Sequence, residues 1–312
     1  MPEIIDMHAK HQKTKPDLIS WERLRAIFGN PRPPHTIWEQ QFDDKADLLE
    51  RIARTAYENF NFDDLKYYYD DLAYSELQPE LFDYLFPVCL MNWHDTLMRN
   101  QGLLGFSYGV HRGRVFEKMM STSRRAEVFS FLHDSFLNRL DHERGFPCVG
   151  HDAAAHRWIS RFNSMGQIMP IQDVWKSWWN LDTPGRAVAA LEYCSGVMYL
   201  KGTNPLFGTW TKTGGGGGPY LFANDSDLFE VCWTNENIEF VSARLMVEFV
   251  NDRVVKAVER LTGEPEAEVA GKLRNDLFAT QDGIPTQEII ESRISELPLL
   301  LADPSATEWW SF

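Results

Sequence analysis

Residues 79–98, PELFDYLFPVCLMNWHDTLM, decide the fold class of this chain. Pro79 stands at a first helical position, where the N–H that proline lacks would have no partner within the helix. The residues after it are apolar on nearly every side, which is typical of a helix buried in a protein core. Pro87 lies inside the stretch, so we expect a kink or a break there. The stretch therefore predicts a buried helix in a mainly α-helical protein.

Further segments with helical periodicity lie on both sides of it. Apolar residues recur at the spacing of one helix face in residues 44–60, 121–140, 235–262, 269–277 and 290–297. Ser121 can cap the second of these helices, and Gly263 and Pro265 stop the third. We therefore expect a multi-helical fold with at least six helices.

The spacing of turn residues predicts two lobes. An N-terminal arm, 1–35, ends in NPRPPH, a helical lobe covers 36–163, and a second mainly helical lobe covers 164–312. The lobes are expected to meet near NSMGQIMP, residues 163–170. Short aromatic and β-branched runs predict a small irregular or β segment near 196–234. The five glycines 214–218 inside it predict a loop, because glycine is costly within a helix or strand.

Composition limits the class of protein further. The 312 residues are 44% hydrophobic and include 11 tryptophans, enough apolar area for a substantial core. We find neither a secretory or transit signal nor an apolar run of the ~20 residues that a bilayer requires, so no membrane contact and a cytoplasmic location are expected. The four cysteines are far apart in the sequence and are expected to be buried thiols: Cys89, Cys148, Cys194 and Cys232.

Charge is distributed unevenly along the chain. The formal net charge is −14, which disfavours nucleic acid as a partner. Residues 39–83 contain 13 acids and four bases, a local −9, whereas residues 99–125 contain six bases and one acid, a local +5. The acidic stretch either keeps the protein soluble or binds a basic protein partner.

Six residues in that acidic stretch are the candidate partner-binding residues: Tyr67, Tyr68, Tyr69, Asp70, Asp71 and Tyr74. Tyrosine offers a large contact area at a low cost in entropy, and carboxylates select basic partners. The alternative is that the rings pack onto the body of the same molecule.

The sequence GFSYGVH, residues 105–111, contains the pattern G-x-S-x-G of a serine hydrolase nucleophile elbow. An elbow needs a buried strand before the serine, but MRNQGLL precedes it here and is typical of the end of a helix. All nine histidines lie at or before His156, which leaves too little room for the strands that usually precede the catalytic histidine. We expect a turn between helices and no nucleophile at Ser107.

A metal site is the alternative functional hypothesis. The dipeptide His-Asp occurs at 94–95, 133–134 and 151–152, and HD phosphohydrolases build metal sites from adjacent His and Asp with ligands from further helices. His94, His133 and Asp134, with Asp173 or Asp182, would fit that order. Histidine on an apolar helix face is more often a hydrogen-bonded core residue, so we expect neither metal nor any other cofactor.

The stretch LQPELFDYLFPVCLMNW, followed by STSRRAEVFSFLHDSFL, resembles the core of small bacterial helical proteins, some of which are candidate immunity proteins encoded beside toxin genes. The resemblance covers residues 38–140 and provides no catalytic residues. It implies that the protein binds a protein partner. Together with the acidic stretch, it predicts a non-catalytic acidic binding protein, of the kind that neutralises a basic toxin.

Overall fold

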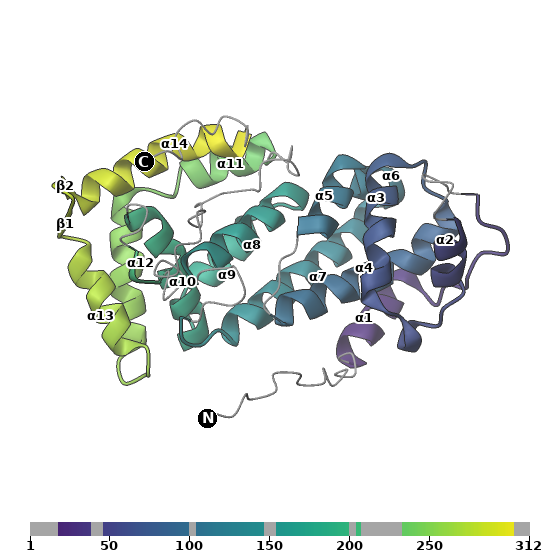
Figure 1. Cartoon of the computed structure of the whole chain (residues 1–312), viewed down its shortest axis with the longest axis horizontal. Coiled ribbons are helices and arrows are strands. Elements are labelled where there is room, and N and C mark those ends of the chain that lie inside the picture. Colours follow the sequence, from purple (N-terminus) through teal and green to yellow (C-terminus); the bar gives the residue numbers. More distant parts are fainter. Residues whose placement is uncertain are drawn as a thin grey trace, which may run out of the picture.

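The computed structural model describes residues 18–38, 46–99, 104–146, 154–199, 204–206 and 233–302. Within these residues the chain forms fourteen α-helices and one two-stranded antiparallel sheet, which confirms the mainly α-helical class. The molecule is elongated, with α1 to α7 at one end, α8 to α10 in the middle and α11 to α14 at the other end (Figure 1).

The elements of the first half are α1 (Leu18–Phe28), α2 (Ala46–Ala53), the 3-10 turns η2 (Tyr57–Asn59) and η3 (Phe62–Leu65), α3 (Lys66–Tyr74), α4 (Pro79–Met98), α5 (Leu104–Arg112), α6 (Val115–Met119) and α7 (Thr122–Asp141). Those of the second half are α8 (Ala154–Ile168), α9 (Gln172–Trp179), α10 (Pro184–Met198), α11 (Asn235–Ser242), α12 (Val247–Arg260), α13 (Ala267–Asp276), β1 (Thr280–Gln281), β2 (Ile284–Pro285) and α14 (Thr286–Ala302).

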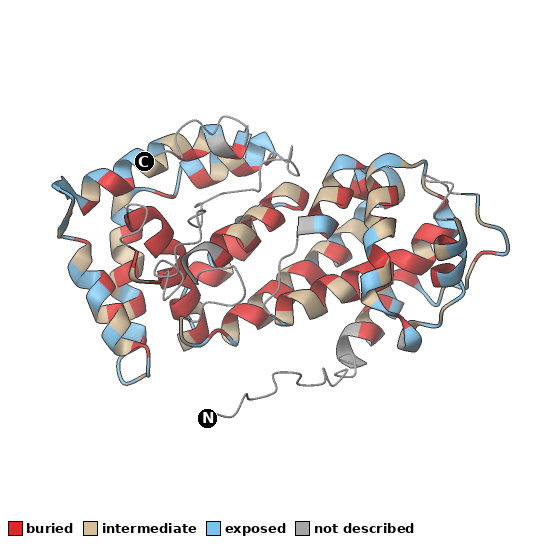
Figure 2. Ribbon diagram, in the orientation of Figure 1, coloured by how far each residue is buried: buried red, intermediate tan, exposed pale blue. Residues whose placement is uncertain are grey.

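Helix α4 is the buried centre of the first half, as its sequence predicts. Helices α1, α2 and α7 pack against it, and Figure 2 shows buried residues along much of its length. The helix continues through Pro87 without a break, because its contacts on several sides outweigh the loss of one backbone hydrogen bond. Arg124 on α7 donates to Asp83 on α4 at 2.7 Å, which fixes the two helices beside each other.

Helix α10 is the corresponding centre of the second half. It contacts α8, α9, α12, α13 and α14, and all of its residues from Ala187 to Met198 are buried. Gly185 allows its first turn to approach the end of α7, since a Cβ there would lie 2.3 Å from the carbonyl oxygen of Leu140. The buried guanidinium of Arg157 on α8 donates to Glu192 on α10 at 2.9 Å.

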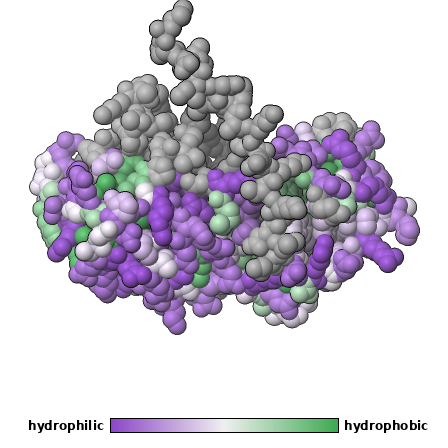
Figure 3. All heavy atoms as spheres, turned by 90° about the horizontal axis from the view of Figure 1, so that it is seen from below, coloured by the Kyte–Doolittle hydropathy of each residue, from purple (hydrophilic) through white to green (hydrophobic). Residues whose placement is uncertain are grey.

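The two halves share one hydrophobic core. Helix α7 packs on α1 and α4 in the first half and on α9 and α10 in the second, while α5 packs on α8. One cluster of buried side chains accordingly extends from Trp21 to Leu301. On the long face in Figure 3, hydrophilic residues cover most of the described surface and hydrophobic ones form small separate patches. Most of the apolar area therefore lies inside.

The predicted segment boundaries differ from the structure at both ends of the first lobe. Residues 163–168 form the last turns of α8 rather than a linker, and only the residues from Met169 to Ile171 separate α8 from α9. Residues 18–28 are not part of a separate arm. They form α1, whose Trp21, Leu24 and Phe28 share one face that is buried in the core.

Two predicted helices also have different bounds. The segment 235–262 is two helices, α11 and α12, because the chain turns between Ser242 and Val247 and so places both Val241 and Val250 in the core. Among the described residues of the segment 44–60, those from Ala46 to Ala53 form a helix, and a 3-10 turn follows. Ser121 caps α7 as predicted, since its hydroxyl accepts from the backbone N–H of Arg124 at 3.3 Å.

The strands that the structure describes lie at 280–281 and 284–285. Residues 196–198 end α10, and most of the remaining predicted segment 196–234, including the five glycines 214–218, lies outside the described residues. In the part of the chain that the structure describes, no helix is both long enough and apolar enough to cross a membrane.

Candidate binding site

Helix α3, which carries the six candidate partner-binding residues, has an inner and an outer face. Tyr68 and Asp71 are buried, with 0% and 7% of their surface exposed. Tyr67, Asp70 and Tyr74 recur at the spacing of the opposite face; the first two are half-buried and Tyr74 is 55% exposed. The structure therefore places three of the six residues where a partner can reach them and buries two.

Tyr69, the sixth residue, lies between the two faces and packs onto the body of the molecule. Its ring meets Phe106 on α5 edge to face, with 6.0 Å between the centroids, and its hydroxyl accepts from Asn92 on α4 at 2.6 Å. Burial raises the pKa of the Tyr69 hydroxyl well above its usual value. This side chain fixes α3 against α4 and α5 and so holds the outer face in place.

Two further contacts define the ends of the outer face. The Tyr74 ring lies 6.2 Å from that of Tyr108 on α5, and the two hydroxyls are hydrogen-bonded. At the other end the ammonium of Lys66 lies 5.0 Å from the centre of the Tyr67 ring. This distance is within the range of a cation–π contact.

The two adjacent carboxylates of α3 have different environments. Burial, with a smaller contribution from the charge of Asp70, raises the pKa of Asp71 to about 7. Burial also raises the pKa of the half-buried Asp70. Asp70 is thus the more accessible of the two carboxylates, whereas Asp71 belongs to the core.

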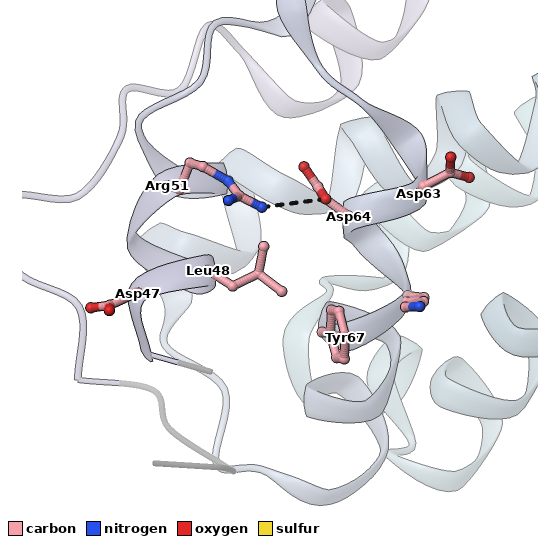
Figure 4. A pocket seen from close by; sticks show the side chains of 7 residues that line it. Asp47, Leu48, Arg51, Asp63, Asp64 and Tyr67 are labelled. Atoms are coloured by element: carbon pink, nitrogen blue, oxygen red, sulfur yellow. Dashed lines mark ion pairs between the residues drawn. The ribbon is translucent and has the colours of Figure 1, made fainter. Parts of the chain in front are cut away.

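A pocket of about 510 Å³ lies beside this outer face, between α2, η3 and α3. Figure 4 shows the side chains that line it: Asp47, Leu48, Arg51, Asp63, Asp64, Lys66 and Tyr67. Leu48 and Tyr67 point toward the space between the helices, while the carboxylates of Asp47 and Asp63 point away from it on opposite sides (Figure 4). The pocket therefore combines two side chains with apolar surface, Leu48 and Tyr67, with five charged residues.

The charges around this pocket do not cancel. Arg51 faces Asp64 and pairs with it at 3.4 Å, and Lys66 lies over the Tyr67 ring. Three aspartates against Arg51 and Lys66 leave a formal −1 at the pocket, and Asp70 adds to it from the next turn of α3. This combination suits the stem and head of a lysine or arginine side chain.

The tyrosine strip is visible in the sequence, but the pocket is not, because the walls of the pocket come from segments that are separate in the chain. Leu48 and Tyr67 are nineteen positions apart, and only the packing of α2 on η3 brings them together. The available signal was the pair Asp63-Asp64 directly before the tyrosines.

The alternative metal ligands do not form a site. His133 Nδ1 lies 2.9 Å from Asp134, and its Nε2 lies 3.3 Å from the hydroxyl of Ser177. Asp134 pairs with Arg23 at 2.6 Å, while the buried ring of His94 packs near Phe131. No group of three possible metal ligands occurs among the described residues. The two further candidates, Asp173 and Asp182, are exposed, and Asp182 pairs with Arg186.

Ser107 lies within helix α5 rather than at a turn, so the predicted turn is wrong, and its side chain is 0% exposed. The glycines of GFSYGVHRG serve the packing of α5 on α3. A Cβ at Gly109 would lie 2.5 Å from the carbonyl oxygen of Tyr69, and one at Gly113 would lie 1.7 Å from that of Leu72. The second glycine of the G-x-S-x-G match, Gly109, is thus explained by a close approach of two helices.

Cys89 and Cys194 are buried, as predicted. Burial raises the pKa of Cys194 to about 12, so this thiol stays protonated at neutral pH. Cys148 and Cys232 lie outside the described residues.

No protein-family model, curated protein or solved structure matches this chain.

Proposed function

We propose that this protein is a non-catalytic binding protein that holds a basic protein partner at the outer face of α3 and the adjacent pocket. The observation that carries the proposal is the gathering of exposed and half-buried acids around tyrosine rings on one surface. Asp63 and Asp70 lie beside Tyr67, and Tyr74 extends the same face by one turn. Tyrosine is enriched in protein interfaces, and a complementary charge gives such a surface its choice of partner.

The geometry favours a lysine or arginine side chain as the part of the partner that enters the pocket. Its aliphatic stem would lie between Leu48 and Tyr67, and its charged head would reach Asp47 or Asp63. An arginine side chain should bind more tightly here than a lysine side chain, because a guanidinium can stack on a tyrosine ring and bind a carboxylate through two N–H groups.

A toxin is the kind of basic partner that we favour. This part of the proposal rests on the resemblance of residues 38–140 to bacterial helical proteins of the immunity type and on the local charge of −9 in residues 39–83. An immunity protein must bind before its toxin acts, and exposed charges of opposite sign accelerate the encounter of two proteins.

The experiment compares two double variants of equal charge change. Asp63→Lys with Asp70→Lys alters the proposed surface, whereas Glu239→Lys with Glu259→Lys alters exposed acids of α11 and α12 in the other half. The wild-type protein first captures its partner from the native cell, and stopped-flow kinetics then measure association at rising salt. Asp71 is left unchanged because its burial would confuse a loss of binding with a loss of folding.

We expect the first variant to associate at least about tenfold more slowly than the wild type and to lose most of the salt dependence. The second variant should associate only slightly more slowly than the wild type, because it changes the net charge of the protein but not the proposed surface. Equal association rates for the two variants would contradict the proposed surface, whatever the identity of the partner.

A further inference from the structure

A second cavity, of about 540 Å³, lies where the two halves of the molecule meet. The first half contributes α5, α6 and the start of α7, and the second half contributes the end of α8 and the start of α11. Its volume falls within the range of roughly 300–1,000 Å³ that is typical of small-molecule sites. It is separate from the acidic pocket between α2 and α3, so a role for it is independent of the proposed function.

The wall from the second half is fixed by hydrogen bonds. The side-chain amide of Asn237 donates to the carbonyl oxygens of Gly166 and Met169 at 2.8 and 2.9 Å, and its oxygen accepts from the backbone N–H of Ile171 at 3.3 Å. Asn237 is 1% exposed. These bonds hold the segment from the end of α8 to the start of α9 in one position, so this wall is formed before any ligand arrives.

The first half contributes an apolar part of the lining beside its charged side chains. Phe116 and Phe129 meet edge to face with their centroids 5.1 Å apart, and Val110 also lines the cavity. The second half adds Ile168 and Met169 to the apolar lining. A ligand for this space therefore needs an apolar body, and aromatic edges among the walls favour a ring.

One bond spans the two halves at this cavity. The Nδ1 of His111 lies 2.9 Å from the backbone carbonyl oxygen of Gln167, and because a carbonyl only accepts, Nδ1 carries the hydrogen. The other ring nitrogen of His111 is not used by this bond. A ligand that contacts both walls would also link α5 to α8.

The charges at the cavity single out Arg125. Arg114 is matched by Glu117, which accepts from two nitrogens of its guanidinium. Arg125 is half-buried and lies one turn from Phe129 on α7, and it makes no ion pair with any residue that the structure describes. Glu236, the other charged lining residue, is exposed. A half-buried charge is screened less than an exposed one, so Arg125 determines the preferred charge of a ligand.

We infer that this cavity binds a small organic carboxylate with an apolar, preferably aromatic, body, whose carboxylate pairs with Arg125. A guanidinium matches a carboxylate through two N–H groups. A ligand with several negative charges is disfavoured, because the other arginine of the lining is already paired and the protein as a whole carries −14. The body of the ligand lies between the phenyl rings and the Ile168–Met169 wall.

The test uses three probes that share one body and differ in the head group: 4-phenylbutyrate, 4-phenylbutanol and 4-phenylbutylamine. Calorimetry and thermal unfolding of the full chain measure their binding. We expect one site per chain and a melting temperature that rises with 4-phenylbutyrate concentration, since the ligand binds only the folded protein. The alcohol and the amine should bind at least about tenfold more weakly, because neither makes the charged bond to Arg125.

Arg125→Met keeps the apolar stem of the side chain and removes its guanidinium, and Arg114→Met is the matched control on the same lining. Arg125→Met should weaken the binding of 4-phenylbutyrate about tenfold, so that it binds no more tightly than 4-phenylbutanol. Arg114→Met should alter binding less than about threefold, since Arg114 is already paired with Glu117. Absence of saturable carboxylate binding up to about 10 mM, or equal binding by wild type and Arg125→Met, would overturn the inference.

Discussion

The close contact of α5 with α3 makes Gly109→Ala a sharp test of the packing. In an open helix this change stabilises by about 1 kcal/mol, because alanine has the higher helix propensity. Here the new Cβ would lie 2.5 Å from the carbonyl oxygen of Tyr69, whereas ordinary contact begins at 3.4 Å. The two helices would have to separate by up to about 0.9 Å, the difference of those distances.

This separation cannot be avoided by a change of rotamer, since the atom that obstructs the methyl group belongs to the backbone. Overpacking of a core typically costs 1–3 kcal/mol, and contact with a backbone atom favours the upper part of that range. After the gain in helix propensity, we expect Gly109→Ala to lower the free energy of unfolding by about 2 kcal/mol.

Gly105→Ala is the matched control, since it lies four residues earlier in the same helix. Its Cβ would meet only the ring edge of Tyr69, at an ordinary 3.5 Å, and Gly105 is exposed. We expect it to leave stability unchanged or to raise it by up to about 0.5 kcal/mol. Urea unfolding followed by tryptophan fluorescence measures both variants. If Gly109→Ala were as stable as Gly105→Ala, the close approach of α3 and α5 would be refuted.

Three further experiments test the buried polar groups. Because the pKa of Asp71 is raised from 3.8 to about 7 in the folded protein, this residue makes the protein less stable as the pH rises from about 4 to 7. Asp71→Asn should remove this part of the pH dependence, as measured by urea unfolding across the same pH range. Arg157→Met should lower the free energy of unfolding by about 1–3 kcal/mol, because it leaves Glu192 buried without the guanidinium that donates to it; burial raises the pKa of Glu192 to about 8, so this side chain is protonated at neutral pH, and unchanged stability would show that the bond is not buried. Ser107 should not react with a fluorophosphonate probe in the native protein, and rapid stoichiometric labelling would contradict its burial in α5.

The sequence determined the helices whose apolar pattern was long and clearly bounded. The stretch 79–98 predicted the position of α4, since Pro79 marks its start and its residues are apolar on nearly every side, but it did not predict that the helix continues through Pro87 without a break. Ser121 likewise marked the start of α7. These are local properties, because a first-turn proline, a capping hydroxyl and a 3.6-residue period act within a few residues of one another.

Only the tertiary structure decided which of the candidate residues are available to a partner. The sequence gives Tyr67, Tyr68 and Tyr69 the same local signal, yet the packing of α3 on α4 and α5 buries Tyr68 and leaves Tyr67 beside a pocket. The sequence could not show that residues 235–262 form two helices with a turn after Ser242, because both parts are amphipathic. Only their packing against the core determines where the chain turns. The two pockets and the close contact at Gly109 are formed by segments that are distant in the chain. A local sequence pattern does not show which distant segments lie side by side.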